Sequence, residues 1–95
     1  MGYRSDVGIM CQPKAYEMFK KEFNVISPHK VLQRDDYHLL IWEWVKWYDE
    51  FDDVAKVNEI MAELNDRDHE DGYGYKFLRI GEEDTDVESR TNNYE

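Results

Sequence analysis

The sequence is poor in residues that could crosslink the chain or hold a metal. It contains one cysteine, Cys11, which excludes an internal disulfide, and three histidines in separate segments. One cysteine and three scattered histidines do not offer the four ligands of a structural zinc site at suitable spacings. No apolar run reaches the roughly 20 residues that a membrane-spanning helix needs, and no signal segment precedes the domain. We therefore expect a cytoplasmic domain at 1–90 and a flexible tail at 91–95.

Motifs that would indicate catalysis are also missing. The chain has no GxGxxG, no GxxxxGK[ST] and no HExxH. The acidic stretch 66–77 does not fit a calcium loop, because Asp71 stands where such a loop needs glycine and Phe77 stands where it needs glutamate. Cys11 has no recognised nucleophile signature around it. We expect a protein that is not an enzyme and has no cofactor or metal.

Basic residues are few, and their shortage is confined to one half of the chain. Residues 1–48 hold 7 Lys or Arg against 6 Asp or Glu, whereas residues 49–95 hold 5 against 16, for a net charge of -10 overall. Such a field opposes direct binding to nucleic acid or anionic membrane and favours a partner protein with a basic surface. An acidic surface that only keeps the protein soluble is the alternative.

The stretch Tyr37–Asp49, YHLLIWEWVKWYD, is the most apolar part of the chain and holds all three tryptophans. Its aromatic and branched residues, without Gly or Pro, predict the central strand of a sheet. Alternation assigns one face to Leu40, Trp42, Trp44 and Tyr48, and the other to Leu39, Ile41, Glu43, Val45 and Trp47.

Other segments predict an α+β domain around this strand. We expect strands at 3–11 and 75–80, helices at 13–23 and 53–65, a short helix started by Ser27 and Pro28, and a possible edge strand at 86–90. This gives a three- to four-stranded antiparallel or mixed sheet with two helices on one face, in the ferredoxin-like order β-α-β-α-β. The open sheet face could form a homodimer.

The candidate partner-binding residues are acidic side chains in three clusters, with neighbouring aromatics as apolar anchors. They are Asp49, Glu50, Asp52 and Asp53; Asp66, Asp68, Glu70 and Asp71; Glu82, Glu83 and Asp84; and the aromatics Tyr48 and Tyr73. In a compact fold these clusters could form a band of negative charge spaced somewhat like phosphates.

Three blocks of sequence resemble a known group of proteins. MGYRSDV at 1–7, VKWYDEFDDV at 45–54 and YKFLRIGEEDTDVE at 75–88 are similar to small, mostly hypothetical proteins of tailed phages and prophages. The resemblance implies origin and supplies no functional residues. Small acidic phage proteins often bind and block host proteins, including those of bacterial immunity.

The resulting hypothesis is an anti-defence (anti-CRISPR-like) or host-takeover inhibitor. It would bind a host nucleic-acid-handling protein through an acidic surface that mimics nucleic acid. A second hypothesis is a nucleotide-sequestering sponge acting against cyclic-nucleotide signalling, in which Arg4, Lys46, Lys76 and Arg79 would bind phosphate. A third is a phage accessory or regulatory protein.

Overall fold

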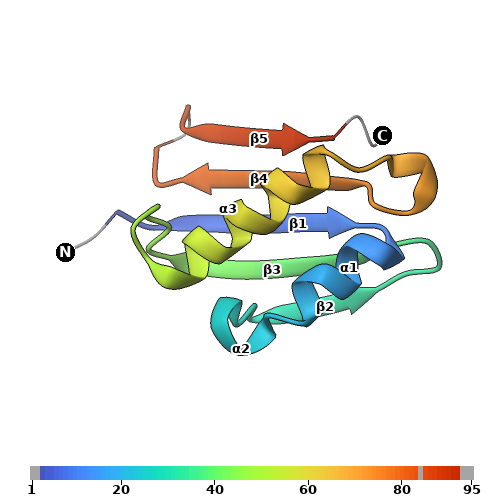
Figure 1. Cartoon of the computed structure of the whole chain (residues 1–95). Helices are drawn as coiled ribbons and strands as arrows, with labels where there is room; N and C mark the ends of the chain where they lie inside the picture. Colours follow the sequence, from blue (N-terminus) through green and yellow to red (C-terminus); the bar gives the residue numbers. More distant parts are fainter. Residues whose placement is uncertain (1–2, 84, 93–95) are drawn as a thin grey trace.

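The computed structural model describes residues 3–83 and 85–92. Within these residues an antiparallel sheet has the strand order β2-β3-β1-β4-β5, and helices pack on one of its faces (Figure 1). The strands are β1 Ser5–Cys11, β2 Lys30–Gln33, β3 His38–Val45, β4 Tyr75–Gly81 and β5 Val87–Thr91. The helices are α1 Pro13–Lys20, α2 Phe23–Ile26, α3 Asp52–Asn65 and the 3-10 helix η1 His69–Asp71.

The α+β class is confirmed, but the strand count and order are not. The described residues form five strands where three to four were predicted, and the elements follow one another as β-α-α-β-β-α-β-β up to β5. The ferredoxin-like order β-α-β-α-β is therefore wrong. The tryptophan-rich strand is also not central, because β1 occupies the middle of the sheet and β3 lies beside it.

The missed strand β2 lies where a short helix was predicted. Ser27 ends α2 with a left-handed backbone (φ 42°), so Pro28 follows a helix and does not start one. The amide of His29 then donates to the carbonyl of Ile41 at 2.8 Å, which brings the chain alongside β3. All four residues of β2 are exposed. A strand with no buried side chain has no alternation by which the sequence could reveal it.

The core lies between the sheet and the helices. In β1, alternate residues Val7, Ile9 and Cys11 are buried, and they meet residues of α1, α2 and α3. In α3 the buried positions are Val54, Val57, Ile60, Met61 and Leu64, which confirms the predicted helix and its apolar face. The indole N–H of buried Trp42 donates to the carbonyl of Ile26 at 2.7 Å and so fastens α2 to the sheet.

A β-bulge near the end of β3 changes the predicted faces. Ser5 pairs with Val45 and Val7 with Trp42, so Glu43 and Trp44 together lie opposite Asp6. Leu40 and Trp42, which alternation assigned to the same face, are both buried. Trp44 is not, because its backbone turns to φ 53° and leaves the side chain 56% exposed. Beyond the bulge the alternation is reversed, so Val45 and Trp47, predicted on the face opposite Leu40 and Trp42, pack against the core.

The other sheet face carries no element among the described residues. It presents the exposed side chains of Leu32, Leu78, Ile80 and Val87, with charged residues such as Lys76 between them. The pairing of Ile80 with Val87, and of Leu32 with Leu39, places these residues on one surface. A homodimer through this face stays a prediction.

Two side chains with hydrogen-bonding groups are buried at the ends of strands, Cys11 in β1 and Asn92 just after β5. Burial raises the pKa of the Cys11 thiol to about 12, and its Sγ lies 3.6 Å from the carbonyl oxygen of His38. The Asn92 side chain accepts from the amide of Tyr75 and donates to the carbonyls of Leu64 and Tyr73. The predicted flexible tail at 91–95 therefore starts too early, because Thr91 ends β5 and Asn92 is buried; 93–95 lie outside the described residues.

Candidate partner-binding site

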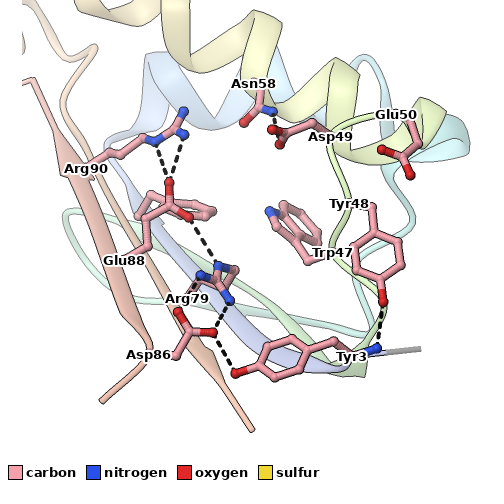
Figure 2. A pocket seen from close by; sticks show the side chains of 11 residues that line it. Tyr3, Trp47, Tyr48, Asp49, Glu50, Asn58, Arg79, Asp86, Glu88 and Arg90 are labelled. Atoms are coloured by element: carbon pink, nitrogen blue, oxygen red, sulfur yellow. Dashed lines mark hydrogen bonds and ion pairs between the residues drawn. The ribbon is translucent and has the colours of Figure 1, made fainter. Parts of the chain in front are cut away.

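Tyr3 joins two segments that are far apart in the sequence. Its amide donates to the hydroxyl of Tyr48 at 2.6 Å, in the loop between β3 and α3. Its own hydroxyl donates to Asp86 at 2.6 Å and accepts from the amide of Glu83 at 3.2 Å, in the turn between β4 and β5. The loop before α3 and the turn between β4 and β5 therefore lie at the same end of the molecule (Figure 1), and Figure 2 shows Tyr3 bonded to Tyr48 on one side and to Asp86 on the other.

The carboxylates at this end are not neutralised. We call this set the acidic end: Asp49, Glu50, Asp52, Asp53, Glu82 and Glu83. Five of the six are exposed and Asp53 is half-buried. Among the residues that the structure describes, none of them forms an ion pair. Asp49 accepts from the Asn58 amide at 3.3 Å, and Glu82 accepts from the backbone N–H of Arg4 at 2.6 Å.

Local structure explains why carboxylates gather there. Asp52 and Asp53 occupy the first turn of α3, where backbone N–H groups have no helical partner and the dipole favours negative charge. Asp53 accepts from the amide of Val54 at 2.8 Å. Phe51, 38% exposed, lies beside them with its ring 5.3 Å from that of Tyr48. The site thus combines charge with an exposed aromatic ring.

The second acidic cluster, 66–71, lies at the opposite end of α3, a helix about 20 Å long (Figure 1). Asp68 uses its carboxylate to cap η1, accepting from the amide of Glu70 at 2.9 Å. Tyr73 is half-buried, and its ring centroid lies 5.5 Å from Lys14 Nζ and 4.9 Å from Arg67 Cζ. The three predicted clusters therefore do not form one band. Asp84, the last predicted residue, lies outside the described residues.

A cavity of about 460 Å³ lies beside the acidic end, between β4–β5 and the loop that precedes α3 (Figure 2). Its β-sheet wall is a network of paired charges. Arg79 donates to Asp86 at 2.9 Å, to Glu88 at 3.1 Å and to Ser5 at 3.0 Å. Arg90 donates to Glu88 at 2.8 Å and lies over the Phe77 ring. Both guanidinium groups in the cavity are therefore already bound by carboxylates.

The network keeps its acids ionised. The hydrogen bond from Arg79 lowers the pKa of Asp86, helped by the bond from Tyr3. Burial alone would raise the pKa of Glu88, but hydrogen bonds from Arg79 and Arg90 hold that pKa below its ordinary value. The bond to Asp86 raises the pKa of Arg79 and that of the Tyr3 hydroxyl. Each shift favours the form of the group that makes the bond.

The opposite wall consists of residues that follow β3 and of α3. Trp47 projects into the space between the two walls, with Tyr48, Asp49, Glu50 and Asn58 around it (Figure 2). Its ring lies 5.3 Å from Trp42 and 6.2 Å from Phe77. With the β-sheet wall included, four carboxylates and two guanidinium groups line the cavity. The lining has a net negative charge.

Three residues of this site were not among the sequence-based candidates: Tyr3, Trp47 and Arg90. Arg79 was a candidate only for phosphate binding in the nucleotide sponge. One signal was present. Asp86, Glu88 and Arg90 alternate along a predicted strand, which places their charged groups on one face. Their partner Arg79 could not be assigned, because the register of β4 against β5 is not readable from the sequence.

The described residues offer no group of three or more His, Cys, Asp or Glu side chains that could hold a metal ion. In the same part of the chain, no helix is long and apolar enough to cross a membrane.

No protein family model, no curated protein and no solved structure matches this chain.

Proposed function

We propose that the protein is an inhibitor that binds a host nucleic-acid-handling protein through its acidic end and occupies a surface that would otherwise bind nucleic acid. The resemblance to small phage proteins favours a defence or host-takeover target. Carboxylates of the acidic end pair with lysines and arginines of the target, and Phe51 and Tyr48 supply apolar contact.

One observation carries this proposal: the two clusters joined through Tyr3 present carboxylates without ion pairs among the described residues. Tyr3 holds the two clusters together through the hydroxyl of Tyr48 and the amide of Glu83, 45 and 80 positions away, so specific tertiary hydrogen bonds maintain their proximity. Concentrated uncompensated charge also speeds encounter with an oppositely charged partner.

The nucleotide sponge receives less support because its proposed cations do not converge. Lys76 and Arg79 lie on opposite faces of β4. Arg79 is occupied by Asp86 and Glu88, and Arg4 donates to the carbonyl of Trp44 at 3.1 Å. A phosphate entering the cavity would compete with these carboxylates for the same donors.

The test is a capture experiment with two matched variants. Tagged protein is incubated with lysate of a phage-sensitive bacterium at low salt and at roughly 0.5 M salt, where exposed charges are strongly screened. One variant neutralises Asp49, Glu50, Glu82 and Glu83 to their amides, and the other neutralises Asp66, Asp68, Glu70 and Asp71. We expect the first to lose a basic partner and the second to keep it.

Inhibition is then measured on the captured protein. Addition of the wild-type chain should weaken the partner's nucleic-acid binding, and the first variant should not. Equal loss of the partner in both variants would show that total charge, not the acidic end, drives binding. A nucleotide released from the purified protein by heat, without any protein partner, would favour the sponge.

A further inference from the structure

We propose that the cavity beside the acidic end is a binding site for an arginine side chain, supplied by the partner protein. The inference rests on the proposed function for the source of that arginine. The cavity itself defines the ligand chemistry. It has one charge-compensated wall, one uncompensated wall and an aromatic ring between them.

The uncompensated wall selects a cation. Asp49 has only a long hydrogen bond from Asn58 at 3.3 Å, and Glu50 has no hydrogen bond or ion pair among the described residues. On the other wall, Arg79 and Arg90 are held by Asp86 and Glu88, so they are not free to bind an anion. An entering positive group therefore meets two acceptors without displacing any ion pair.

The ring of Trp47 selects a flat cation. It lies among the cavity residues in Figure 2, between the side chains of β5 and those that follow β3. A guanidinium group is planar, stacks on aromatic faces and carries five N–H donors, whereas an ammonium group is compact and strongly hydrated. The volume of about 460 Å³ admits a side chain together with water. Arginine thus fits both the charge and the shape of the lining.

The probe is Nα-acetyl-arginine methylamide, and its control is the citrulline analogue, which has the same shape without the charge. Binding is followed by the three tryptophan indole N–H resonances in ¹H–¹⁵N spectra. Trp44 does not line the cavity and serves as the internal reference, whereas the Trp42 ring lies 5.3 Å from that of Trp47 and is not used for that purpose. We expect a saturable shift of the Trp47 resonance with the arginine probe alone.

Two single variants with the same change in charge complete the test. Glu50→Gln should weaken binding of the arginine probe by up to about fivefold, the range of an exposed ion pair. Glu70→Gln, in the cluster at the other end of α3, should leave it unchanged. Equal shifts with the citrulline probe, equal weakening by both variants, or no Trp47 shift at all would each overturn the proposal.

These outcomes are independent of the proposed function. A chain that binds the arginine probe but captures no basic protein retains the arginine site and loses the inhibitor. A chain that captures a basic partner through the acidic end without a response of Trp47 retains the inhibitor and loses the arginine site.

Discussion

The two ends of α3 have similar numbers of acidic residues but treat them differently. At the end near Tyr3, the carboxylates of the acidic end stand without ion pairs among the described residues. At the other end, Asp68 caps η1, Glu63 pairs with Arg67 at 3.1 Å, and Lys14 and Arg67 both lie close to the Tyr73 ring. Among the described residues, six carboxylates at the first end have no ion pair, against Asp66, Glu70 and Asp71 at the other, so the first end attracts a cationic partner more strongly.

The two ends are also fastened by different means. At the end of α3 away from Tyr3, the far end, the buried Asn92 side chain bonds three backbone groups. At the end near Tyr3, the near end, Tyr3 makes half-buried bonds to Tyr48 and Asp86 and an exposed bond to Glu83. Buried bonds are costly to lose, because the freed groups cannot reach water. The hydrogen bonds at the far end therefore contribute more to stability, whereas those at the near end are more accessible to solvent.

The largest effect is expected from Asn92→Ala. It leaves the amide of Tyr75 and the carbonyls of Leu64 and Tyr73 without their partner, in a site where Asn92 is only 8% exposed. We expect a loss of about 3 kcal/mol in the free energy of unfolding, measured by urea denaturation. Asn58→Ala, which removes one long bond to Asp49, should cost less than about 0.5 kcal/mol. Equal costs would contradict the distinction between the ends.

Gly81→Ala should damage the near end. A Cβ at Gly81 would collide with the carboxylate of Asp86 and the hydroxyl of Tyr3, so the bond between them would have to shift. A cost of about 1 to 3 kcal/mol is typical of such overpacking. The matched control is Gly8→Ala, whose Cβ would meet only the Leu40 carbonyl at 4.0 Å. Thermal unfolding of both variants measures the difference; a stable Gly81→Ala would disprove close packing around Tyr3.

Tyr3→Phe should have a smaller effect, confined to the near end. It removes the hydroxyl that bonds Asp86 and Glu83 but keeps the ring and the backbone bond to Tyr48. A loss in the free energy of unfolding smaller than that of Gly81→Ala is expected. Amide exchange should quicken at Glu83 while Tyr75, at the far end, keeps its protection. Faster exchange at both sites would mean that Tyr3 supports the whole fold.

The smallest effect is a pH dependence that belongs to the near end. The folded-state pKa of Asp86 lies below its ordinary value of 3.8, so the ionised carboxylate stabilises the fold above that pH. This contribution is lost as the pH falls from about 4 through the lower folded value. Asp86→Asn should therefore flatten the acid side of the stability profile, followed by denaturation at pH 7 and pH 3. An unchanged slope would show that the ion pair with Arg79 contributes nothing.

Patterns that depend on burial could be predicted from the sequence. The helix at 53–65 and the strand at 75–80 have strong apolar periods, and the structure has α3 and β4 there. Strand β2 has no buried residue, and the bulge at Glu43 and Trp44 is set by pairing with β1, so neither left a readable pattern. Local preference was overridden by contacts distant in sequence.

In the candidate site, too, some features could be predicted from the sequence, whereas others depend on contacts between distant residues. The carboxylates of the acidic end were found because charge is visible in composition, but their separation from Asp66 to Asp71 depends on the length and direction of α3. Tyr3 escaped notice because its partner Asp86 is 83 positions away, and Arg79 was predicted to bind phosphate because its pairing with Asp86, 7 positions away, could not be read from the sequence. Which of these distant residues face one another is decided by the tertiary fold and the register of the sheet.

The rate at which the buried Cys11 thiol is chemically modified can report on opening of the fold. It is the single thiol in the sequence, it is fully buried in the middle strand, and its pKa of about 12 keeps it protonated at neutral pH. Alkylating reagents react with thiolates, so they can modify Cys11 only when the sheet separates from the helices. The labelling rate therefore follows the population of globally opened molecules. A bound partner that stabilises the native chain would slow that rate in proportion to its occupancy, without any label being attached at the binding surface.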